Sequence, residues 1–384
     1  MRLMYFIPLL APIGGQERTL TDKANYLVSQ GHDVMFVTYE NNVPIVYPLD
    51  PRVRHEDLSC HFYSLYSYPF WKRFHEALKL KRQFRQKMKA QIDAFRPDVI
   101  VIAIPNTENF ICDVMKLAGQ TPVVIESHLA QGRQVFDRGI TEKWLYLINN
   151  PMKAVRTCSL LVALTKGDAE CWQRQGVKNI RVIPNPVTCY PPQMAPVEGH
   201  RPHRIIAVGR LALQKRMDRL VNAFALISDK YPEWYIDIYG EGELHDEVQA
   251  LITQKGLDRQ IHLQAPTNQI YEQYQTSQFF VLSSDFEGFG LVIVEAMACG
   301  IPVVVTECPF GPSEIVDHGK TGLLARMDEH DLAEKMEWMI THDAERNTMG
   351  AAAYQAAGRY RKELTMKEWE QAYLSVVKPQ TSNH

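Results

Sequence analysis

The chain alternates short apolar runs with segments of helical periodicity, and it does so in two separate halves. The apolar runs lie at residues 3–8, 33–39, 98–103, 123–127 and 160–164, and then at 204–209, 235–239, 261–264, 279–284 and 302–306. Segments between them, such as 17–30, have the spacing of a helix. Strands that alternate with helices favour parallel sheets covered by helices, and runs rich in Val, Ile and Phe are typical of buried parallel strands. The sequence therefore predicts an α/β protein.

A proline-rich stretch separates the two halves. It begins at Asn185-Pro186, contains Pro191-Pro192, and continues to Pro202 without any hydrophobic period. A chain of 384 residues is also too long for one ordinary domain. We predict an N-terminal domain over residues 1–186, a linker over 187–202, a C-terminal domain over 203–364 and a final segment over 365–384.

The final segment has the pattern of an apolar helix. Met366, Trp369, Tyr373 and Val376 recur at three- and four-residue spacing within residues 365–377. A helix this apolar must dock on another part of the protein. It could cross back onto the first domain.

Charge and cysteine content exclude several classes of protein. The formal net charge is −2, so no overall field attracts nucleic acid. The seven cysteines form no Cys-x-x-Cys pair, which gives no indication of a zinc site or disulfide framework and suits a reducing cytosol. Residues 1–13 are apolar, but a first strand that runs into Gly14-Gly15 explains them better than a signal peptide does. No apolar run approaches the roughly 20 residues that span a bilayer, and we expect a cytoplasmic protein.

The segment from Asp285 to Glu295 points most directly to a ligand site. It follows an apolar run and leads into a helix expected to start near Gly290. Ligands of open α/β sheets bind outside the carboxyl ends of the strands, and helix N-termini favour phosphate. Glu287 and Glu295 are separated by up to roughly 12 Å, at about 1.5 Å per residue. This spacing suits a nucleotide sugar, whereas a surface turn followed by a helix with a solvated Glu295 is the alternative.

Basic residues follow the first apolar run of the second half. Gly209 and Arg210 end that run, and Lys215 precedes a helix expected to begin near Met217. A guanidinium fork and an ammonium point charge suit a diphosphate, which gains negative charge as it leaves. The chain has no Asp-x-Asp, so a carboxylate-held Mg²⁺ is not indicated and we expect neither a metal nor another cofactor. A solvated basic turn is the alternative.

Two positions in the first half also lie at strand ends. Gly14 and Gly15 form the first strand-to-helix turn, where glycine lets a phosphate or an acceptor approach the backbone. His128 ends the run at 123–127 and could hydrogen-bond a sugar hydroxyl or a developing charge. The alternatives are a turn that needs glycine only for its shape, and a buried histidine bonded to a neighbouring carbonyl.

The loop at 308–316 follows the last apolar run. Pro312 suits the first turn of a helix, and Ser313 could help to cap it. We expect this loop to line a donor pocket, with a plain helix start as the alternative.

A basic amphipathic helix is predicted from Trp71 to Arg96. These residues hold nine Lys or Arg against two acidic residues. One imperfect apolar stripe is formed by Phe74, Leu78, Phe84, Met88, Ile92 and Phe95. Such a helix can lie on an anionic membrane surface, or it can cover a sheet with its basic face in water.

Together these motifs resemble the retaining GT-B glycosyltransferases of family 4. The resemblance covers nearly the whole chain and is carried by Gly209-Arg210-Leu211, Lys215, the segment Glu287-Gly288-Phe289-Gly290-Leu291 through Glu295, Gly14-Gly15 and His128. It implies two facing Rossmann-like domains with the site in the cleft between them, and a C-terminal helix that crosses back to the first domain. The glycine loop, which reads Ile13-Gly14-Gly15-Gln16-Glu17, departs from the family, so acceptor identity cannot be carried over.

The resemblance also implies a role for each residue. Arg210 and Lys215 would hold the diphosphate, Glu287 would lie near the donor sugar, and Glu295 would take the ribose hydroxyls. The amides of Gly288, Phe289, Gly290 and Leu291 would contact sugar or phosphate, His128 would lie near the donor sugar, and Gly14-Gly15 would meet diphosphate and acceptor. In such enzymes a front-face retaining mechanism is usually proposed, in which the leaving phosphate oxygen accepts the acceptor's proton.

These features lead to three hypotheses. The first is a retaining, metal-independent hexosyltransferase that uses a UDP-hexose such as UDP-Gal, UDP-GalNAc or UDP-Glc in cell-surface polysaccharide assembly. Its acceptor would be a glycan or a lipid-linked sugar, because residues 310–315 look like those of bacterial capsular or lipid-linked oligosaccharide enzymes. The second is a sugar-nucleotide epimerase, which would need further carboxylate and histidine acid–base groups. The third is a non-catalytic protein that binds the inner face of a membrane through its basic helix.

Overall fold

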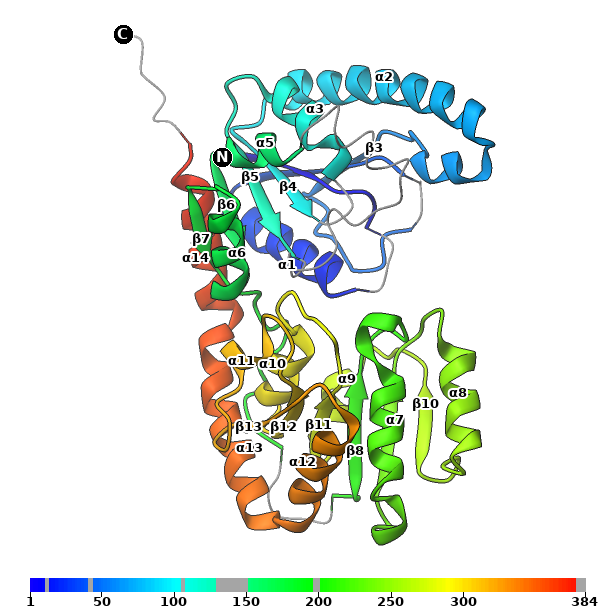
Figure 1. Ribbon diagram of the computed structural model, residues 1–384. Helices are drawn as coiled ribbons and strands as arrows, with labels where there is room; N and C mark the ends of the chain where they lie inside the picture. Colours follow the sequence, from blue (N-terminus) through cyan, green and yellow to red (C-terminus); the bar gives the residue numbers. More distant parts are fainter. Residues whose placement is uncertain (11–13, 41–43, 105–107, 129–150, 196–200, 378–384) are drawn as a thin grey trace. The chain divides into compact units, whose positions relative to one another are not determined.

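The computed structural model describes residues 1–10, 14–40, 44–104, 108–128, 151–195 and 201–377 (Figure 1). The chain divides into two compact units. The first consists of Met1–Pro184 together with Met366–His384, and the second of Asn185–Thr365. Each unit is a parallel sheet with helices packed on it, which confirms the predicted α/β class.

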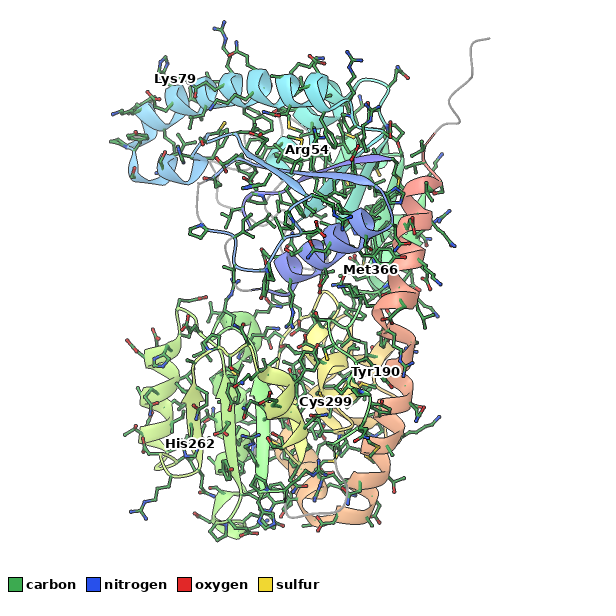
Figure 2. All side chains as sticks on the ribbon, turned by 180° about the vertical axis from the view of Figure 1, so that it is seen from behind. Arg54, Lys79, Tyr190, His262, Cys299 and Met366 are labelled. Atoms are coloured by element: carbon green, nitrogen blue, oxygen red, sulfur yellow. The ribbon has the colours of Figure 1, made fainter. Side chains whose placement is uncertain are left out.

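The first unit holds a seven-stranded sheet in the order β3-β2-β1-β4-β5-β6-β7. Its strands are β1 Arg2–Phe6, β2 Asp33–Thr38, β3 Arg54–Asp57, β4 Val99–Ile104, β5 Val123–Ser127, β6 Leu160–Ala163 and β7 Ile180–Val182. Its helices are α1 Gly15–Ser29, η1 Phe62–Ser67, α2 Phe70–Phe95, α3 Glu108–Ala118, α5 Pro151–Arg156 and α6 Lys166–Arg174. The expected strands are all present, but β3 and β7 were not predicted. β3 is a polar edge strand that begins at Arg54 (Figure 2), and β7 has only three residues, so neither has an apolar run.

The second unit holds a six-stranded sheet in the order β10-β9-β8-β11-β12-β13. Its strands are β8 Arg204–Val208, β9 Tyr235–Tyr239, β10 Ile261–Gln264, β11 Phe279–Leu282, β12 Val303–Thr306 and β13 Gly322–Ala325. Its helices are η2 Leu213–Lys215, α7 Met217–Ala225, η3 Ser228–Lys230, α8 His245–Gln254, α9 Ile270–Gln275, α10 Leu291–Ala298, α11 Pro312–Ile315, α12 Glu329–Thr341, α13 Asp343–Ala357 and η4 Gly358–Tyr360. β13 was also missed, because its four residues begin with a glycine.

The last helix, α14 Lys362–Leu374, begins in the second unit and ends in the first. Within the first unit, Trp369 donates its indole N–H to the carbonyl oxygen of Pro184 at 3.0 Å. A ring nitrogen of His32, just beyond α1, lies 2.6 Å from a carboxylate oxygen of Glu370. The C-terminal helix is therefore part of the N-terminal unit from Met366 onward (Figure 2).

The apolar stripe predicted on α2 divides into two parts. Its C-terminal part lies in the core of the first unit and consists of Phe84, Met88, Ile92 and Phe95. Phe74 and Leu78 are more than half exposed, and Trp71 is 85% exposed. At about 100° per residue the six predicted residues lie within about 120° of one another, so they share one side of the helix, but the core covers only the C-terminal part of that side. The predicted stripe is therefore buried only in part.

None of the helices in the described parts of the chain combines the length and the apolar character that a membrane crossing requires.

Candidate functional site

An ion pair stands at the carboxyl edge of the second sheet. Glu287 follows β11 and is 5% exposed. Its Oε1 atom lies 2.7 Å from Nζ of Lys215, at the end of η2, and accepts the hydroxyl of Ser284 at 2.6 Å. The Lys215 side chain passes over Gly209, where a Cβ atom would lie 3.4–3.6 Å from its methylene carbons. The structure thus brings together three predicted site residues, and it adds Ser284, which the sequence did not indicate.

Both of these contacts to Glu287 use the same oxygen. Among the residues that the structure describes, Oε2 of Glu287 has no hydrogen-bond donor. A carboxylate oxygen accepts hydrogen bonds only, so Oε2 suits a hydroxyl or an N–H group of a ligand. Glu287 can therefore keep its partner Lys215 and still accept a hydrogen bond from a ligand.

The loop that carries Glu287 is fixed by arginines that sequence reasoning missed. The carboxylate of Asp285 lies 2.6 Å from a guanidinium nitrogen of Arg219 and 3.3 Å from one of Arg216. Its backbone N–H donates to the carbonyl oxygen of Gln214 at 2.9 Å. These contacts join residues about 70 positions apart, and only folding brings them together. They hold the loop after β11 against the segment that carries Lys215.

Arg210 differs from Lys215 in its surroundings. The next residue, Leu211, is buried, and its N–H donates to the carbonyl oxygen of Glu241 at 2.9 Å. The Arg210 side chain is exposed and has no hydrogen-bond or ion-pair partner within the described part of the chain. Its guanidinium is available to an anion.

The N-terminus of α10 has unused donors. Its N-cap, Gly290, has φ +91°, a left-handed conformation that favours glycine. Outside the masked segments, no acceptor is found for the backbone N–H groups of residues 288–292. Free N–H groups at a helix N-terminus favour a phosphate or another anion. The predicted amides of Gly288, Phe289 and Leu291 therefore lie where a ligand can use them.

The loop at 308–316 packs directly on the loop of Glu287. The backbone N–H of Glu287 donates to the carbonyl oxygen of Pro309 at 2.9 Å, and the N–H of Phe310 donates to the backbone carbonyl oxygen of Glu287 at 3.3 Å. A Cβ atom on Gly311 would lie 1.8 Å from the carbonyl oxygen of Phe289, so only glycine fits. Pro312 begins α11 as predicted. The expected cap from Ser313 was wrong, because the N-cap is Gly311 and no side chain caps this helix.

Glu295 lies on α10 and is 4% exposed. Its Oε1 atom accepts the hydroxyl of Tyr271, on α9, at 3.4 Å. The Tyr271 oxygen in turn accepts the backbone N–H of Cys189 at 3.1 Å. Tyr271 is a further residue that the sequence did not indicate, and it orients the carboxylate of Glu295.

The remaining predicted residues belong to the first unit. Gly14 is the N-cap of α1, and Gly15 is its first residue. His128 directly follows β5, and its Nε2 atom lies 2.8 Å from Oε2 of Glu126. Its side chain is only 2% exposed. The alternative of a histidine bonded to a carbonyl is thus wrong, because the partner of the ring is a buried carboxylate.

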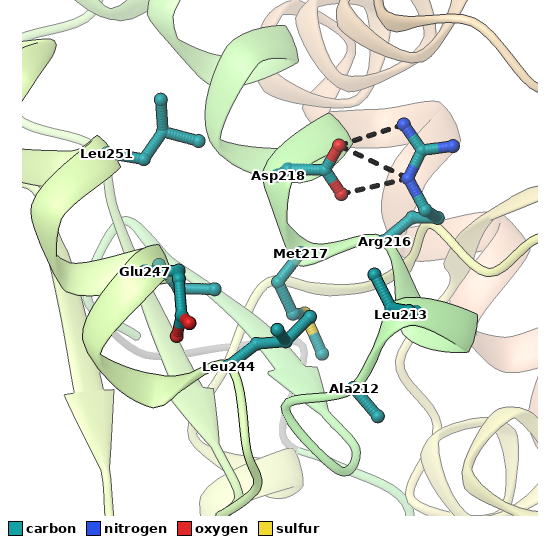
Figure 3. A pocket seen from close by; sticks show the side chains of 9 residues that line it. Ala212, Leu213, Arg216, Met217, Asp218, Leu244, Glu247 and Leu251 are labelled. Atoms are coloured by element: carbon teal, nitrogen blue, oxygen red, sulfur yellow. Dashed lines mark hydrogen bonds and ion pairs between the residues drawn. The ribbon is translucent and has the colours of Figure 1, made fainter.

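The second unit has a pocket of about 250 Å³ (Figure 3). Apolar side chains of η2, α7 and α8, including Leu213, Met217 and Leu251, form much of its lining, and Arg216 and Asp218 pair at its edge. None of the predicted site residues lines it. Within the described residues, no three His, Cys, Asp or Glu side chains gather as they would around a metal ion.

The sequence matches two family descriptions that follow one another along the chain. Residues 13–189 match "Glycosyltransferase Family 4", and residues 195–356 match "Glycosyl transferases group 1". The chain is a group 1 glycosyltransferase. It is therefore a transferase, as the first of the three hypotheses predicts.

Full-length relatives and solved structures agree with this assignment. The glycosyltransferase is 24% identical over 376 residues to an uncharacterized glycosyltransferase of Haemophilus influenzae, across 96% of this chain and 99% of the relative. It is 23% identical to the amylovoran biosynthesis glycosyltransferase AmsD of Erwinia amylovora, across 96% and 98%. It superposes on the pneumococcal O-GlcNAc transferase GtfA, solved with UDP and GlcNAc, with a TM-score of 0.77, 14% identity and 99% of each chain covered. This likeness confirms the GT-B fold.

Proposed function

We propose that this glycosyltransferase moves a hexose from a UDP-hexose to a glycan or lipid-linked acceptor, with retention of anomeric configuration and without a metal ion. The observation that carries the proposal is the arrangement around Glu287. Three groups follow strand ends of one sheet and have no partner among the described residues: one oxygen of the buried Glu287 carboxylate, the exposed guanidinium of Arg210, and the amides at the start of α10. Such a set offers an acceptor to a sugar and donors to a diphosphate.

Two relatives support the choice of substrates. GtfA was solved with UDP and GlcNAc, and AmsD is named for amylovoran biosynthesis. We extend both to this chain as a UDP-hexose donor and an acceptor in polysaccharide assembly. Glu295, oriented by Tyr271, would take the ribose hydroxyls.

The chemistry needs electrostatic stabilisation more than a protein base. The bond between the anomeric carbon and the phosphate oxygen breaks while a bond to the acceptor oxygen forms on the same face. The acceptor's proton passes to the leaving phosphate oxygen. Arg210, Lys215 and the amides at the start of α10 would stabilise the negative charge that grows on the diphosphate. Lys215 would do so while it remains paired with Glu287.

The test is incubation of the purified protein with a panel of nucleotide sugars and candidate saccharide acceptors, with and without a chelator. We expect transfer or slow hydrolysis of a UDP-hexose, and NMR of the product should show the anomeric configuration of the donor. Activity should survive the chelator. Binding of no sugar nucleotide would refute the proposal as a whole, an inverted product would refute retention, and loss of activity with the chelator would refute metal independence.

A second proposal concerns the exposed face of α2, which we infer to bind an anionic membrane surface. Trp71, Phe74 and Leu78 share one face of the helix and are 85%, 55% and 54% exposed. Further along the helix, Arg82 continues this face at about 100° per residue. Arg82 is exposed and makes no ion pair with any described residue. Apolar anchors beside basic residues suit the interface of an anionic bilayer.

Sedimentation with vesicles tests this face. The protein should bind vesicles of phosphatidylglycerol and phosphatidylcholine at low salt, less at high salt, and not to phosphatidylcholine alone. Phe74→Ser with Leu78→Ser should abolish binding, while Leu226→Ser, at a position in the second unit that is 47% exposed, serves as the matched control. Equal binding by the double variant and the wild type would contradict the assignment.

A further inference from the structure

A buried network of ionisable side chains lies behind His128 in the first unit. Oε2 of Glu126 accepts hydrogen bonds from Nζ of Lys23 and from Nε2 of His128, and Oε1 accepts the hydroxyl of Tyr373. The hydroxyl of Tyr5 donates to that of Tyr373 at 3.0 Å. Strand β5, helix α1, strand β1 and the C-terminal helix each contribute to it. Nothing in the resemblance to known glycosyltransferases assigned a role to Glu126, Lys23 or Tyr373.

The network keeps Glu126 ionised. Burial raises the pKa of this carboxyl, but the ammonium of Lys23 and the hydrogen bond from His128 outweigh burial and hold its pKa at about 2. Lys23 itself is fully buried, and its ammonium lies 3.5 Å from the ring centroid of Trp369. A carboxylate can only accept hydrogen bonds, so the ring nitrogen that faces it must carry a hydrogen.

This requirement settles the state of the His128 ring. Burial lowers the pKa of His128 despite the opposing effect of Glu126, so the ring is neutral at neutral pH. In a neutral imidazole only one nitrogen carries hydrogen. If that nitrogen is Nε2, then Nδ1 presents a bare lone pair. Nδ1 is buried and has no hydrogen-bond partner in the described part of the chain. A buried acceptor without a donor is costly, which points to a ligand that supplies one.

We propose that Glu126, itself held by Lys23 and Tyr373, is a positioning residue that fixes His128 as the Nε2–H tautomer, so that Nδ1 accepts a hydrogen bond from a hydroxyl or amide N–H of the substrate sugar. This assignment rests on the proposed sugar transfer. It also distinguishes between the two parts of the donor that could contact His128. An acceptor nitrogen needs a hydrogen-bond donor, and the fully ionised diphosphate of a nucleotide sugar has no hydrogen to donate. The partner of His128 is then the sugar and not the diphosphate.

Nitrogen NMR of protein labelled with ¹⁵N-histidine tests the tautomer without any assay of activity. His128→Gln identifies the resonances of His128 by their loss. In the wild type at pH 7, we expect Nε2 in the protonated range and Nδ1 in the unprotonated range. An Nδ1–H tautomer or an imidazolium would overturn the proposal, whether or not the protein transfers sugar.

Variants of the network then test the positioning role. In Glu126→Asp the shorter side chain withdraws the carboxylate from Nε2, so the Nδ1–H tautomer should appear. Tyr373→Phe keeps the ring and its packing, and Lys23 still holds the carboxylate, so the Nε2–H tautomer should persist. If Glu126→Asp does not fold, Glu126→Ala, which removes the acceptor of Nε2 altogether, replaces it. An unchanged tautomer in a folded Glu126 variant would overturn the role of Glu126.

Ligand titration tests the partner of Nδ1. We expect UDP-hexose to shift the Nδ1 resonance of His128, and UDP at about pH 8.5, where its terminal phosphate is almost fully ionised, to leave it unshifted. In a series of UDP-hexoses that each lack one sugar hydroxyl, one member should leave the Nδ1 resonance unshifted. Its kcat/KM should be about ten- to hundred-fold lower than that of the parent UDP-hexose, and this difference should disappear in His128→Gln. If a bound UDP-hexose leaves Nδ1 unshifted, the proposal is overturned. If calorimetry shows no binding of UDP-hexose, the proposed function fails instead, while the tautomer measurement still decides the role of Glu126.

Discussion

The ammonium nitrogen of Lys215 lies 2.7 Å from a carboxylate oxygen of Glu287. Both side chains are largely buried, with 16% and 7% exposure. Each therefore has its charge compensated before any substrate binds, and neither is an isolated ion that waits for a ligand. Among the described residues, the pair leaves one oxygen of Glu287 and the guanidinium of Arg210 open to a ligand.

We expect Glu287→Ala to reduce transfer much more than nucleotide binding, because the open oxygen of Glu287 should face the sugar. Removal of a group that acts on the transition state lowers kcat, whereas removal of uniform binding raises KM. Steady-state kinetics and calorimetry with UDP separate the two effects. The role would be refuted by a rate within a few-fold of the wild type, or by a loss of UDP affinity as large as the loss of rate.

Arg210→Ala and Lys215→Ala should each lower kcat/KM by on the order of 10²-fold or more if these cations stabilise the leaving diphosphate. Their thermal stabilities should differ. The Arg210 side chain is exposed and unpaired among the described residues, so its loss should leave Tm nearly unchanged, whereas the loss of Lys215 leaves Glu287 without its cation. Rates near that of the wild type in both variants would contradict these roles.

Asp285→Asn should destabilise the second unit by about 1–3 kcal/mol, because it leaves a buried guanidinium without its carboxylate. That guanidinium belongs to Arg219, whose side chain is 7% exposed. The matched control is Asp218→Asn, since the ion pair of Asp218 with Arg216 is 48% and 34% exposed and should contribute less than about 1 kcal/mol. Urea unfolding of both variants compares them directly. Equal effects would show that burial does not set the strength of these pairs.

Gly311→Ala should displace the loop of Glu287 and lower both Tm and transfer. The new Cβ atom would lie 1.8 Å from the carbonyl oxygen of Phe289, a contact that only a backbone shift can relieve. Gly358→Ala is the control, because its φ of −55° is helical and its nearest neighbour would be Oη of Tyr190 at 3.7 Å. Wild-type activity in Gly311→Ala would show that this contact does not position Glu287.

Acid should destabilise the first unit in two stages. Burial lowers the pKa of His128 from its ordinary 6.5. Burial raises the pKa of Glu126, but Lys23 and His128 outweigh burial and hold this pKa at about 2 instead of 4.5. The unfolded chain therefore binds more protons, so stability falls as pH falls below about 6.5 and again below about 4.5. Urea unfolding from pH 8 to pH 3.5 measures this. In His128→Gln the first stage should flatten, and an unchanged slope would assign it to other groups.

The sequence was sufficient for the strands that lie inside the sheets. Runs such as Val123–Ser127 and Tyr235–Tyr239 agree with the structure residue for residue, since buried parallel strands are rich in Val, Ile and aromatic residues even where they carry a single charge. The edge strand Arg54–Asp57 could not be found in this way, because its residues are all polar.

The site could be predicted by type and position but not by its contacts. The sequence placed Lys215 and Glu287 at strand ends, but nothing in it shows that two residues 72 positions apart form a pair. The network behind His128 did leave one signal. Glu126 is a charged residue within an otherwise apolar run, and a charge in a central strand requires a buried partner.

The order of synthesis gives the C-terminal helix a further meaning. Tyr373 and Trp369 enclose Glu126 and Lys23, yet they are made after the whole second unit. When residues 1–184 have been translated, the positions that Trp369 and Tyr373 occupy are still empty, and the first unit stays incomplete until these two residues follow. A glycosyltransferase of this design completes the surroundings of Glu126, the partner of His128, only after Tyr373 has been translated, so a product that stops before α14 would lack these contacts.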